Sequence, residues 1–282
     1  SELLDFHDVL DPQVWTTMGF FMNYEMQTTM FQPVGGMDMI GKGFAKQVHE
    51  LITHGAKVTR IAQDDKGVTI SYTDVTSGAA SEAKADYCVC TIPLSVLAQI
   101  DTQVSPAMKA AIRAVPYTAQ VKIGLEFKRR FWEEDESIYG GISFTNQEIG
   151  LVSYPNNDFF ADKPAVMLGA FARDMGAYHL AGMTPEQRIE AALSQGSKIH
   201  PQYRAEYMSG ASVAWSRVPW TLGCCARWNE DTRKTHYQTL VGLDGRIALA
   251  GEHASYVGCW MEGALLSSID AITRLHKRAL EA

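Results

Sequence analysis

The stretch GEHASYVGCWMEGAL, residues 251–265, governs the interpretation of the whole chain. The six residues before it, 245–250, are mostly apolar and predict a short buried strand. The residues after it predict a helix over 262–279, with Leu265, Ile269, Ile272 and Leu275 on one face. A glycine turn between a strand and a helix start lets backbone N–H groups approach a phosphate closely. The fingerprint G-x-G-x-x-G, which usually marks a dinucleotide site, nevertheless does not occur in the sequence.

Composition and charge restrict the class of protein. The chain has 282 residues, 46% hydrophobic and 20% charged, which is typical of a globular protein with one large core or two modest ones. The net charge of −7, without any cluster of lysine and arginine, argues against a nucleic-acid surface. No apolar run reaches the ~18 residues that a membrane-spanning helix needs. We therefore expect a globular protein whose partner is neither a nucleic acid nor a membrane.

The cysteines predict neither a disulfide framework nor a metal site. Their odd number and irregular spacing favour free thiols, and Cys88 and Cys90 lie in an apolar strand where buried thiols are expected. The sequence contains no H-E-x-x-H motif and no pair of C-x-x-C motifs. The five cysteines are Cys88, Cys90, Cys224, Cys225 and Cys259.

Hydrophobic periodicity predicts a mixed α/β protein with two interwoven domains. Residues 119–127 alternate cleanly, with Val121, Ile123, Leu125 and Phe127 on one face of a strand. Residues 11–31 are rich in methionine and aromatic residues, which favours a core-facing helix or the wall of a pocket. Further helices are predicted over 39–54, 105–114 and 184–196, and further strands over 56–61, 67–72, 87–92, 138–154, 165–172 and 211–217.

Seven stretches together resemble the flavin-dependent amine oxidases, and among them the bacterial L-amino-acid oxidases. They occur in the family's order, cover most of the chain, and the last is the most specific. The stretches are PVGGMD (33–38), VTRIAQDDKGVTISY (58–72), YCVCTIPLSVL (87–97), QVKIGLEFKRRFW (120–132), GGISFTNQEIGLVSYPN (140–156), WSRVPWTLGC (215–224) and RIALAGEHASYVGCWMEGAL (246–265).

The resemblance implies the C-terminal portion of a two-domain, FAD-dependent amine oxidase fold. Residues 1–30 would then be a helical part of the substrate domain and 101–218 its main part. Residues 31–100 and 219–282 would be segments of the FAD-binding domain, the second with the C-terminal helix. The family's glycine fingerprint would lie before Ser1, so we expect a second chain that carries it, and a hetero-oligomer. This chain alone would expose a large apolar face.

The resemblance also assigns cofactor contacts. The Gly251 turn would lie beneath the ribityl and pyrophosphate of FAD, and the Met261 amide near the flavin's pyrimidine edge, where the positive helix start stabilises negative charge. Val58 would contact the adenine through its backbone. Cys224 occupies the position at which monoamine oxidases bind the flavin covalently, so a thioether is one hypothesis and a free buried cysteine the favoured one. The cofactor-binding residues predicted in this way are Gly35, Gly36, Met37, Val58, Trp215, Gly223, Cys224, Gly251, Glu252 and Met261.

Two residues match the family's catalytic positions. Lys122 would hold a water molecule near flavin N5, where its charge favours electron transfer to oxygen. An alternating strand equally permits Lys122 to point to solvent. Trp260 would form one wall of the aromatic cage that orients the substrate amine, or would be a core tryptophan.

The predicted substrate pocket departs from the family at three positions. Phe171 stands where amino-acid oxidases have a tyrosine that binds the substrate carboxylate, and phenylalanine has no hydroxyl group. Arg173 would replace this contact, read a second acidic group, or be a surface arginine paired with Asp174. Cys225 replaces the second cage residue, a tyrosine in monoamine oxidases, and would widen the pocket.

The leading functional interpretation is FAD-dependent oxidation of an L-amino acid to an imine, then a keto acid and ammonia, with oxygen reduced to hydrogen peroxide. Trp260 and the stretch 140–156 favour it. Phe171 favours an oxidase or dehydrogenase of amines without a carboxylate. Some relatives are amino-acid monooxygenases, and a non-catalytic subunit is a fourth alternative, against which Lys122, Glu252 and Trp260 argue.

Overall fold

The structure is a computed structural model that describes residues 31–281. These residues form two compact units: one comprises residues 58–72 and 81–281, and the other comprises 31–57 and 73–80. The predicted helix over 11–31 lies almost entirely outside the described residues. The predicted division into FAD-binding and substrate-binding segments stays a prediction.

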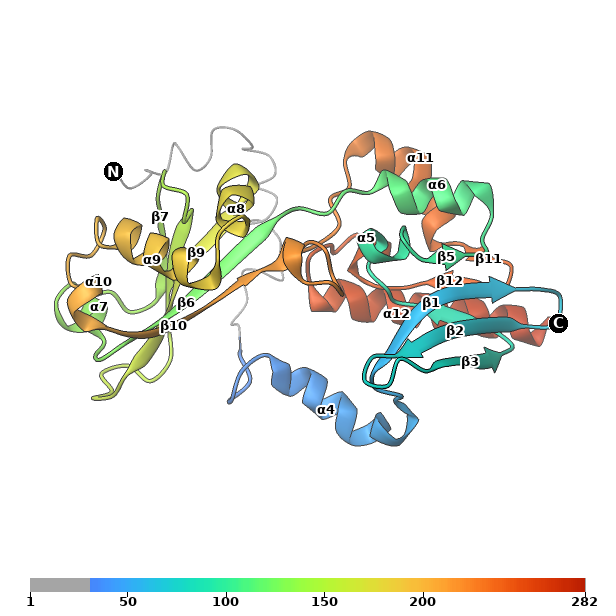
Figure 1. The fold of residues 1–282 in the computed structure, drawn as a ribbon, viewed down its shortest axis with the longest axis horizontal. Helices are drawn as coiled ribbons and strands as arrows, with labels where there is room; N and C mark the ends of the chain where they lie inside the picture. Colours follow the sequence, from blue (N-terminus) through green and yellow to red (C-terminus); the bar gives the residue numbers. More distant parts are fainter. Residues whose placement is uncertain (1–30, 282) are drawn as a thin grey trace. The chain divides into compact units, whose positions relative to one another are not determined.

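A five-stranded antiparallel sheet forms the main core of the first unit, in the order β10-β6-β9-β8-β7 (Figure 1). The strand β6, which lies between β10 and β9, shows the predicted alternation, because Val121, Ile123, Leu125 and Phe127 are completely buried while Lys122 is exposed. The strands are β6 (Gln120–Phe127), β7 (Gly141–Phe144), β8 (Leu151–Tyr154), β9 (Ala165–Arg173) and β10 (Tyr207–Ala214).

Short helices pack against this sheet. The helix predicted over 184–196 is confirmed, and Thr184 caps it by accepting a hydrogen bond from the Gln187 N–H. The strand predicted over 211–217 is wrong at its end, because Trp215–Arg217 form a 3-10 turn, η3. The helices are α7 (Phe131–Glu134), α8 (Asp174–Ala181), α9 (Pro185–Gly196) and α10 (Tyr203–Glu206).

A three-stranded sheet, β11-β12-β4, precedes the Gly251 turn. The strands β12 (Ile247–Leu249) and β4 (Cys88–Cys90) are parallel, whereas β11 (Leu243–Asp244) is antiparallel to β12. The strand predicted over 87–92 is therefore confirmed but shorter, and its two cysteines are buried free thiols as expected. Around this sheet lie α5 (Leu94–Leu97), α6 (Pro106–Ala114) and α11 (Glu230–Val241).

A separate four-stranded sheet has the order β3-β2-β1-β5. The strands β1 (Ala56–Gln63) and β2 (Val68–Asp74) confirm the predicted hairpin, which turns where the Asp64 N–H donates to the Gly67 carbonyl. The strand β3 (Ala80–Ala85) was not predicted, because its side chains are all exposed and carry no apolar alternation. The short β5 (Asp101–Thr102) pairs in parallel with β1.

The second unit contains α4 (Asp38–Val48) and the 3-10 turn η2 (His49–Leu51). The helix predicted over 39–54 is thus confirmed but ends earlier. Gly35 and Gly36 before it adopt positive φ angles of 96° and 110°, which favour glycine.

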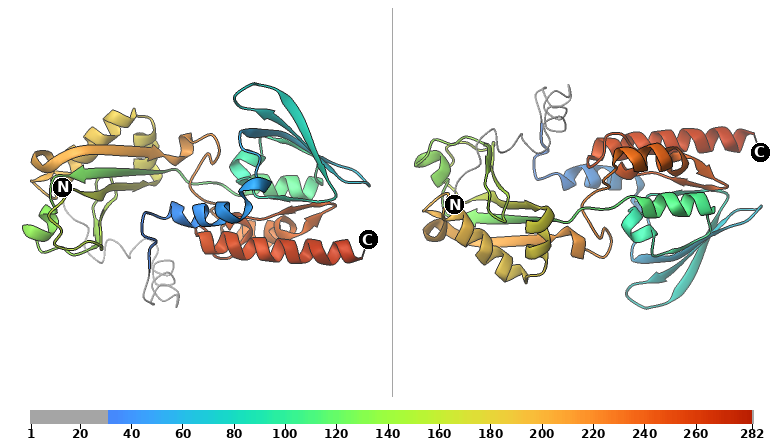
Figure 2. Two further views of the ribbon diagram at one scale, coloured as in Figure 1. Left: turned by 90° about the horizontal axis from the view of Figure 1, so that it is seen from below. Right: turned by 90° about the horizontal axis from the view of Figure 1, so that it is seen from above.

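The helix α12 (Met261–Leu280) is the long red helix that ends at the C-terminus in Figure 2. It contacts β12 and the turn that follows β12, and the residues that it buries are small rather than large. Gly263, Ser267 and Ala271 are buried, and Ala271 contacts Ala248 and Ala250. The predicted apolar face exists but is uncovered: Leu265, Ile269 and Ile272 are 42%, 66% and 53% exposed. Small side chains permit the close approach of the helix to the sheet, and this approach leaves the large ones outside.

We expect Gly263→Ala to lower the free energy of unfolding by about 1–3 kcal/mol. An added Cβ would lie 1.8 Å from the Val257 carbonyl oxygen, so the backbone must shift. Gly41→Ala in α4 is the matched control, because nothing lies within 4 Å of its added Cβ, and helix propensity alone predicts no loss there. Urea unfolding measures both, and equal midpoints for the two variants would contradict the packing of α12.

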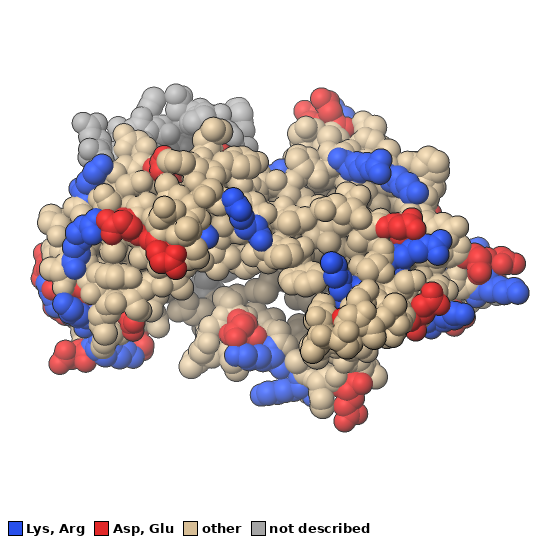
Figure 3. Space-filling view, viewed as in Figure 1, with Lys and Arg blue, Asp and Glu red and all other residues tan. Residues whose placement is uncertain are grey.

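Acidic and basic side chains are interspersed on the face shown in Figure 3, rather than gathered into a patch of one sign. Among the described residues, none of the helices has the length and apolar character needed to cross a membrane.

Candidate active site

The Gly251 turn follows β12 and requires glycine. Gly251 has a φ of 140°, and an added Cβ would lie 2.6 Å from the His253 ring. Ser267 of α12 secures the turn, since its hydroxyl accepts from the Gly251 N–H and lies 2.8 Å from the Gly251 carbonyl oxygen. The short 3-10 turn η4 (Glu252–Ala254) comes next. The predicted strand, glycine turn and helix are therefore all present in this order.

The start of α12 fits a polar or anionic group. Trp260 occupies the N-cap position, and its indole has no acceptor for the N–H groups of the first turn. These groups carry the partial positive charge of a long helix.

Burial lowers the pKa of His253 to about 4, so its ring is neutral near pH 7. The buried His253 Nε2 atom has no hydrogen-bond partner among the described residues.

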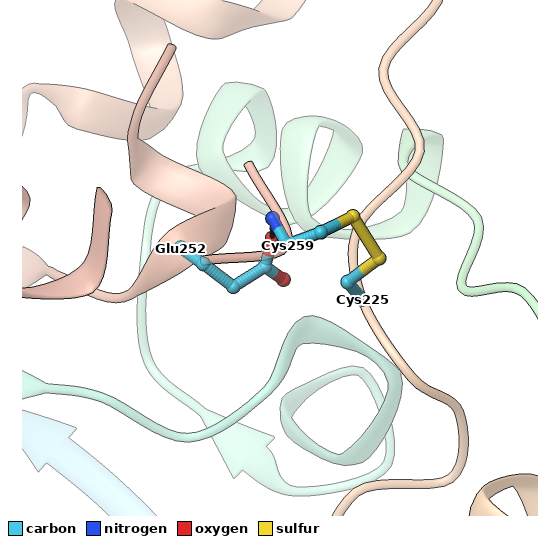
Figure 4. Close-up of side chains that lie close together, drawn as sticks. All are labelled: Cys225, Glu252 and Cys259. Carbon is cyan, nitrogen blue, oxygen red and sulfur yellow. Dashed lines mark hydrogen bonds between the residues drawn. A yellow bond between two sulfur atoms is a disulfide. The ribbon is translucent and has the colours of Figure 1, made fainter. Parts of the chain in front are cut away.

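Glu252 joins the Gly251 turn to two neighbouring loops. Its carboxylate accepts hydrogen bonds from the Ala226 N–H at 2.8 Å and from the Cys259 N–H at 2.9 Å. Figure 4 shows its side chain directed toward Cys259 and the adjacent disulfide. Glu252 therefore holds the chain around Cys225 against the loop that precedes α12.

A disulfide between Cys225 and Cys259 connects the same two loops (Figure 4). The expectation that the cysteines form no disulfide was wrong. The two residues are 34 positions apart, and only the folding of both loops around Glu252 brings their Cα atoms to 5.1 Å. Both sulfurs lie within 4.8 Å of a Glu252 oxygen, but a disulfide leaves neither as a thiolate ligand for a metal.

The disulfide also changes the role predicted for Cys225. We expected its small side chain to widen the substrate pocket, but Cys225 is buried and bonded to Cys259. Cys259 immediately precedes Trp260, so the disulfide anchors the loop that positions this tryptophan. Cys259 was not among the predicted site residues. The only sequence signal for it was its position inside the family-matching stretch 246–265, while Cys225 directly follows the stretch 215–224.

We expect the double variant Cys225→Ser/Cys259→Ser to lose about 2–4 kcal/mol of unfolding free energy, because the open loop gains entropy in the unfolded state. The variant Cys224→Ser is the matched control, since Cys224 is a neighbouring free thiol. Thiol titration of the unfolded, unreduced protein should find the three free cysteines Cys88, Cys90 and Cys224. Five titratable thiols would show that the disulfide does not form.

The loop that carries Gly223 and Cys224 lies beside the chain leading into β6. The Cys224 N–H donates to the Thr118 carbonyl at 3.0 Å, and Tyr117 forms a β-bridge with Ala226. Gly223 has a φ of 152°, and a Cβ there would lie 2.6 Å from the Tyr117 Cβ. The next residue in register, Arg227, donates its N–H to the Pro116 carbonyl at 2.9 Å.

Lys122 and Arg173 both lie over the ring of Phe171. Lys122 pairs with Phe171 in the β6–β9 register, and its Nζ is 4.8 Å from the centre of the ring. The Arg173 guanidinium carbon is 4.6 Å from the same centre. Partial desolvation and the charge of Arg227 lower the pKa of Arg173. Within residues 31–281, neither Lys122 nor Arg173 forms an ion pair, so the predicted alternative of an Arg173–Asp174 pair is wrong.

Cys224 is a free thiol close to these charges, and it is exposed rather than buried as predicted. Desolvation raises the pKa of the thiol, while Lys122, Arg173 and Arg227 act in the opposite direction; the net shift is upward. Cys224 is therefore protonated near pH 7. The thioether to flavin stays a hypothesis.

The other predicted residues lie in several parts of the fold. Trp260 is 43% exposed, which excludes a core tryptophan, and Met261 opens α12 with a similarly exposed side chain. Trp215 begins η3 and is half-buried, whereas Val58 of β1 packs on the core that contains Ile61. Gly35, Gly36 and Met37 belong to the second unit. Their roles in cofactor binding stay predictions.

Comparison with known proteins identifies the class. Residues 9–275 match the family described as "Flavin containing amine oxidoreductase", and the chain belongs to this family. An L-amino-acid oxidase of Siganus canaliculatus is 30% identical over 87% of this chain and 47% of its own length. The flavin-dependent L-tryptophan oxidase RebO of Lentzea aerocolonigenes is 29% identical, over 88% of this chain and 52% of its own.

Solved structures agree with the fold. The cyclohexylamine oxidase from Brevibacterium oxydans IH-35A matches with a TM-score of 0.70 at 19% identity, covering 88% of this chain and 54% of that one. The expected family and the partial, mixed α/β amine oxidase fold are thus confirmed, and the cofactor is FAD. The chain spans about half the length of the relatives it matches.

Proposed function

We propose that this chain forms part of an L-amino-acid oxidase, which converts an L-amino acid into its imine and, after hydrolysis, a keto acid and ammonia, with oxygen reduced to hydrogen peroxide. The observation that carries the proposal is the arrangement of side chains around Phe171 and Cys224. The Lys122 Nζ atom of β6 and the Arg173 guanidinium carbon of β9 lie 4.8 Å and 4.6 Å from the centre of the Phe171 ring. The Cys224 N–H donates to the Thr118 carbonyl, in the segment that leads into β6. This arrangement supports a shared site for the predicted catalytic and substrate-binding residues.

The cofactor site would be formed by the Gly251 turn and the start of α12. The N–H groups of the first turn at Met261 would bind the negatively charged edge of FAD. When bound, FAD accepts two electrons from the amine and delivers them to oxygen. The exposed Cys224 would lie beside the cofactor as a thiol or in a thioether.

The chain's own residues would bind and orient the other reactants. Lys122 would hold a water molecule at its Nζ, where its charge stabilises negative charge that develops on oxygen. The exposed ring of Trp260 would orient the substrate amine and exclude water. The apolar ring of Phe171 would contact the substrate side chain, and Arg173 would bind a carboxylate.

A segment with the family's glycine fingerprint would complete the FAD site, and we propose that a second chain supplies it. The uncovered face of α12, with Leu265, Leu266, Ile269 and Ile272, supports this proposal because a face of this kind marks an interface. The strand β4 also supports it, because within residues 31–281 it lies at the edge of its sheet, and parallel strands are normally covered and flanked by further elements.

Native and denaturing mass spectrometry of the purified protein, combined with flavin absorbance, tests the assembly. The expected result is a second chain of domain size with one FAD per pair. An L-amino-acid panel with peroxide and ammonia detection then tests the reaction. A 31.2 kDa species that neither contains nor acquires FAD when the fingerprint segment is added would refute the proposal.

A second candidate function is oxidation of amines that lack a carboxylate. Phe171 favours it, because phenylalanine cannot donate the hydrogen bond that a carboxylate accepts. Rates with matched pairs of an amino acid and the corresponding decarboxylated amine separate the two functions. A monooxygenase would instead release an amide from the same amino acid.

A further inference from the structure

Three cations surround Phe171 and Cys224 without acidic partners. Lys122, Arg173 and Arg227 form no ion pair with any residue between 31 and 281, although the chain as a whole is acidic. Arg227 has no assigned role in the cofactor site or the substrate pocket described above. The charges lie close enough to interact, since Arg227 lowers the pKa of Arg173 and all three cations act on the Cys224 thiol.

The backbone places these cations on or beside β6 and the chain that leads into it. Arg227 is anchored to Pro116, Cys224 to Thr118, and Arg173 is opposite Gln120 in the β6–β9 register. The three cations therefore come from neighbouring segments: Lys122 belongs to β6 itself, whereas the backbones of Arg173 and Arg227 lie beside Gln120 and Pro116. Buried side-chain atoms of Thr118 and Gln120, Oγ1 and Oε1, also lack hydrogen-bond partners among the described residues.

The nearest acids do not neutralise this cluster. Asp174 raises the pKa of Arg173 by its charge, but the net shift of Arg173 is downward. Both carboxylate oxygens of Glu252 already accept backbone hydrogen bonds, from Ala226 and Cys259. Guanidinium groups that repel one another are stabilised when a ligand brings carboxylates to them, because charge-assisted hydrogen bonds replace the repulsion.

We propose that Arg173 and Arg227 make this enzyme selective for an amino acid with an acidic side chain. The inference rests on the proposed function, and it names the substrate class of that site. A substrate that reacts as the free amine and carries two carboxylates has a charge of −2, which matches the two guanidinium groups. The charge of Lys122 then remains available for its proposed role in the reaction with oxygen. Arg227 is then a specificity residue of the pocket, and Phe171 is an apolar wall next to Lys122 and Arg173.

The first test compares kcat/KM for L-glutamate and L-aspartate with that for L-glutamine and L-leucine in the assembled, FAD-containing enzyme. We expect the acidic substrates to be preferred. We expect Arg227→Gln and Arg173→Gln each to reduce this preference roughly 10- to 100-fold, the size of a lost hydrogen bond to a charged group. Arg113→Gln on α6 is the charge-matched control and should leave the preference unchanged.

A second readout needs no turnover. Glutarate and butyrate, which have two carboxylates and one, are titrated while the flavin spectrum or the heat of binding is followed. Glutarate should bind more tightly than butyrate, and Arg227→Gln should remove the difference. An unchanged difference in the variant would overturn the inference. Loss of FAD from Arg227→Gln, with unaltered selectivity, would also overturn it, because Arg227 would then serve the cofactor.

The two proposals fail in different ways. If amino acids are oxidised but L-glutamine or L-leucine is preferred to the acidic substrates, the inference is wrong and the proposed function stands. If none of the L-amino acids is oxidised, the proposed function is wrong. In that case the glutarate titration decides whether the two arginines bind a dicarboxylate.

Discussion

The variant Glu133→Ala is expected to lose about 3–5 kcal/mol of unfolding free energy, the usual cost of leaving one member of a buried ion pair alone. Arg130, in the loop before α7, is 3% exposed, and Glu133, in α7, is 4% exposed. The Arg130 Nε donates to Glu133 Oε1 at 2.7 Å, and the Phe160 N–H donates to Oε2 at 2.9 Å. The variant would leave a buried guanidinium that, among residues 31–281, keeps the Asn157 carbonyl as a hydrogen-bond acceptor and the Trp132 ring as a neighbour, but has no carboxylate in contact.

The same pair makes stability depend on pH. Burial raises the pKa of Glu133, but the hydrogen bonds from Arg130 and Phe160 outweigh it, so the net pKa lies below the ordinary value of 4.5. A lowered pKa means that the contribution is fully present above about pH 4.5 and is lost as the pH falls through the folded-state pKa. Urea unfolding at a series of acidic pH values should show less pH dependence in Glu133→Ala than in the natural protein.

Glu134→Ala is the matched control for this prediction. Glu134 is the next residue and pairs with Arg129, but its side chain is half exposed. Exposed ion pairs contribute about 0–1 kcal/mol, so a small change is expected. Equal losses for the two variants would contradict the structure of the Arg130–Glu133 pair.

The variant Lys122→Met is expected to slow the reaction with oxygen roughly 10²- to 10³-fold, the cost of removing one preorganised electrostatic group. The prediction depends on the proposed function. Lys122 has no carboxylate partner among the described residues, and its ammonium lies over the Phe171 ring. Methionine keeps the length of the side chain but removes its charge.

Stopped-flow absorbance separates the two halves of the reaction. Anaerobic bleaching of the flavin by the amino acid should change little in Lys122→Met, while recolouring on mixing with oxygen should be slow. Lys128→Met, one residue beyond β6, is the matched control; its Nζ bonds the Ala205 carbonyl instead. Normal recolouring in Lys122→Met would exclude the role in oxygen reduction.

Much of the local structure could be predicted from neighbouring residues. The alternation in 119–127 depends on burial of one strand face, and the Thr184 cap depends on a side chain three residues from its partner. The Gly251 turn was also predicted from local sequence, because glycine can adopt the positive φ angle that this turn has. The strand β3 escaped prediction because only its pairing with β2 makes it a strand.

The candidate site could be predicted only in part. Its residue types followed from matching stretches, and the structure places Lys122, Phe171, Arg173 and Cys224 near one another. The Cys225–Cys259 disulfide and the exposure of Cys224 could not be foreseen. They depend on how loops far apart in the sequence fold around Glu252.

The amino-acid order alone thus predicted most helices and strands, because these depend on spacing over a few residues, and its resemblance to known sequences pointed to the family and the cofactor class. The tertiary structure alone established which face of α12 packs on β12 and which cations meet at Phe171. Periodicity marks an apolar face but not its partner. The buried face of α12 turned out to be the stripe of Gly263, Ser267 and Ala271. Gly263 lies against the Val257 carbonyl, Ser267 bonds Gly251 and Ala271 contacts Ala248 of β12, and contacts this close leave space only for small side chains.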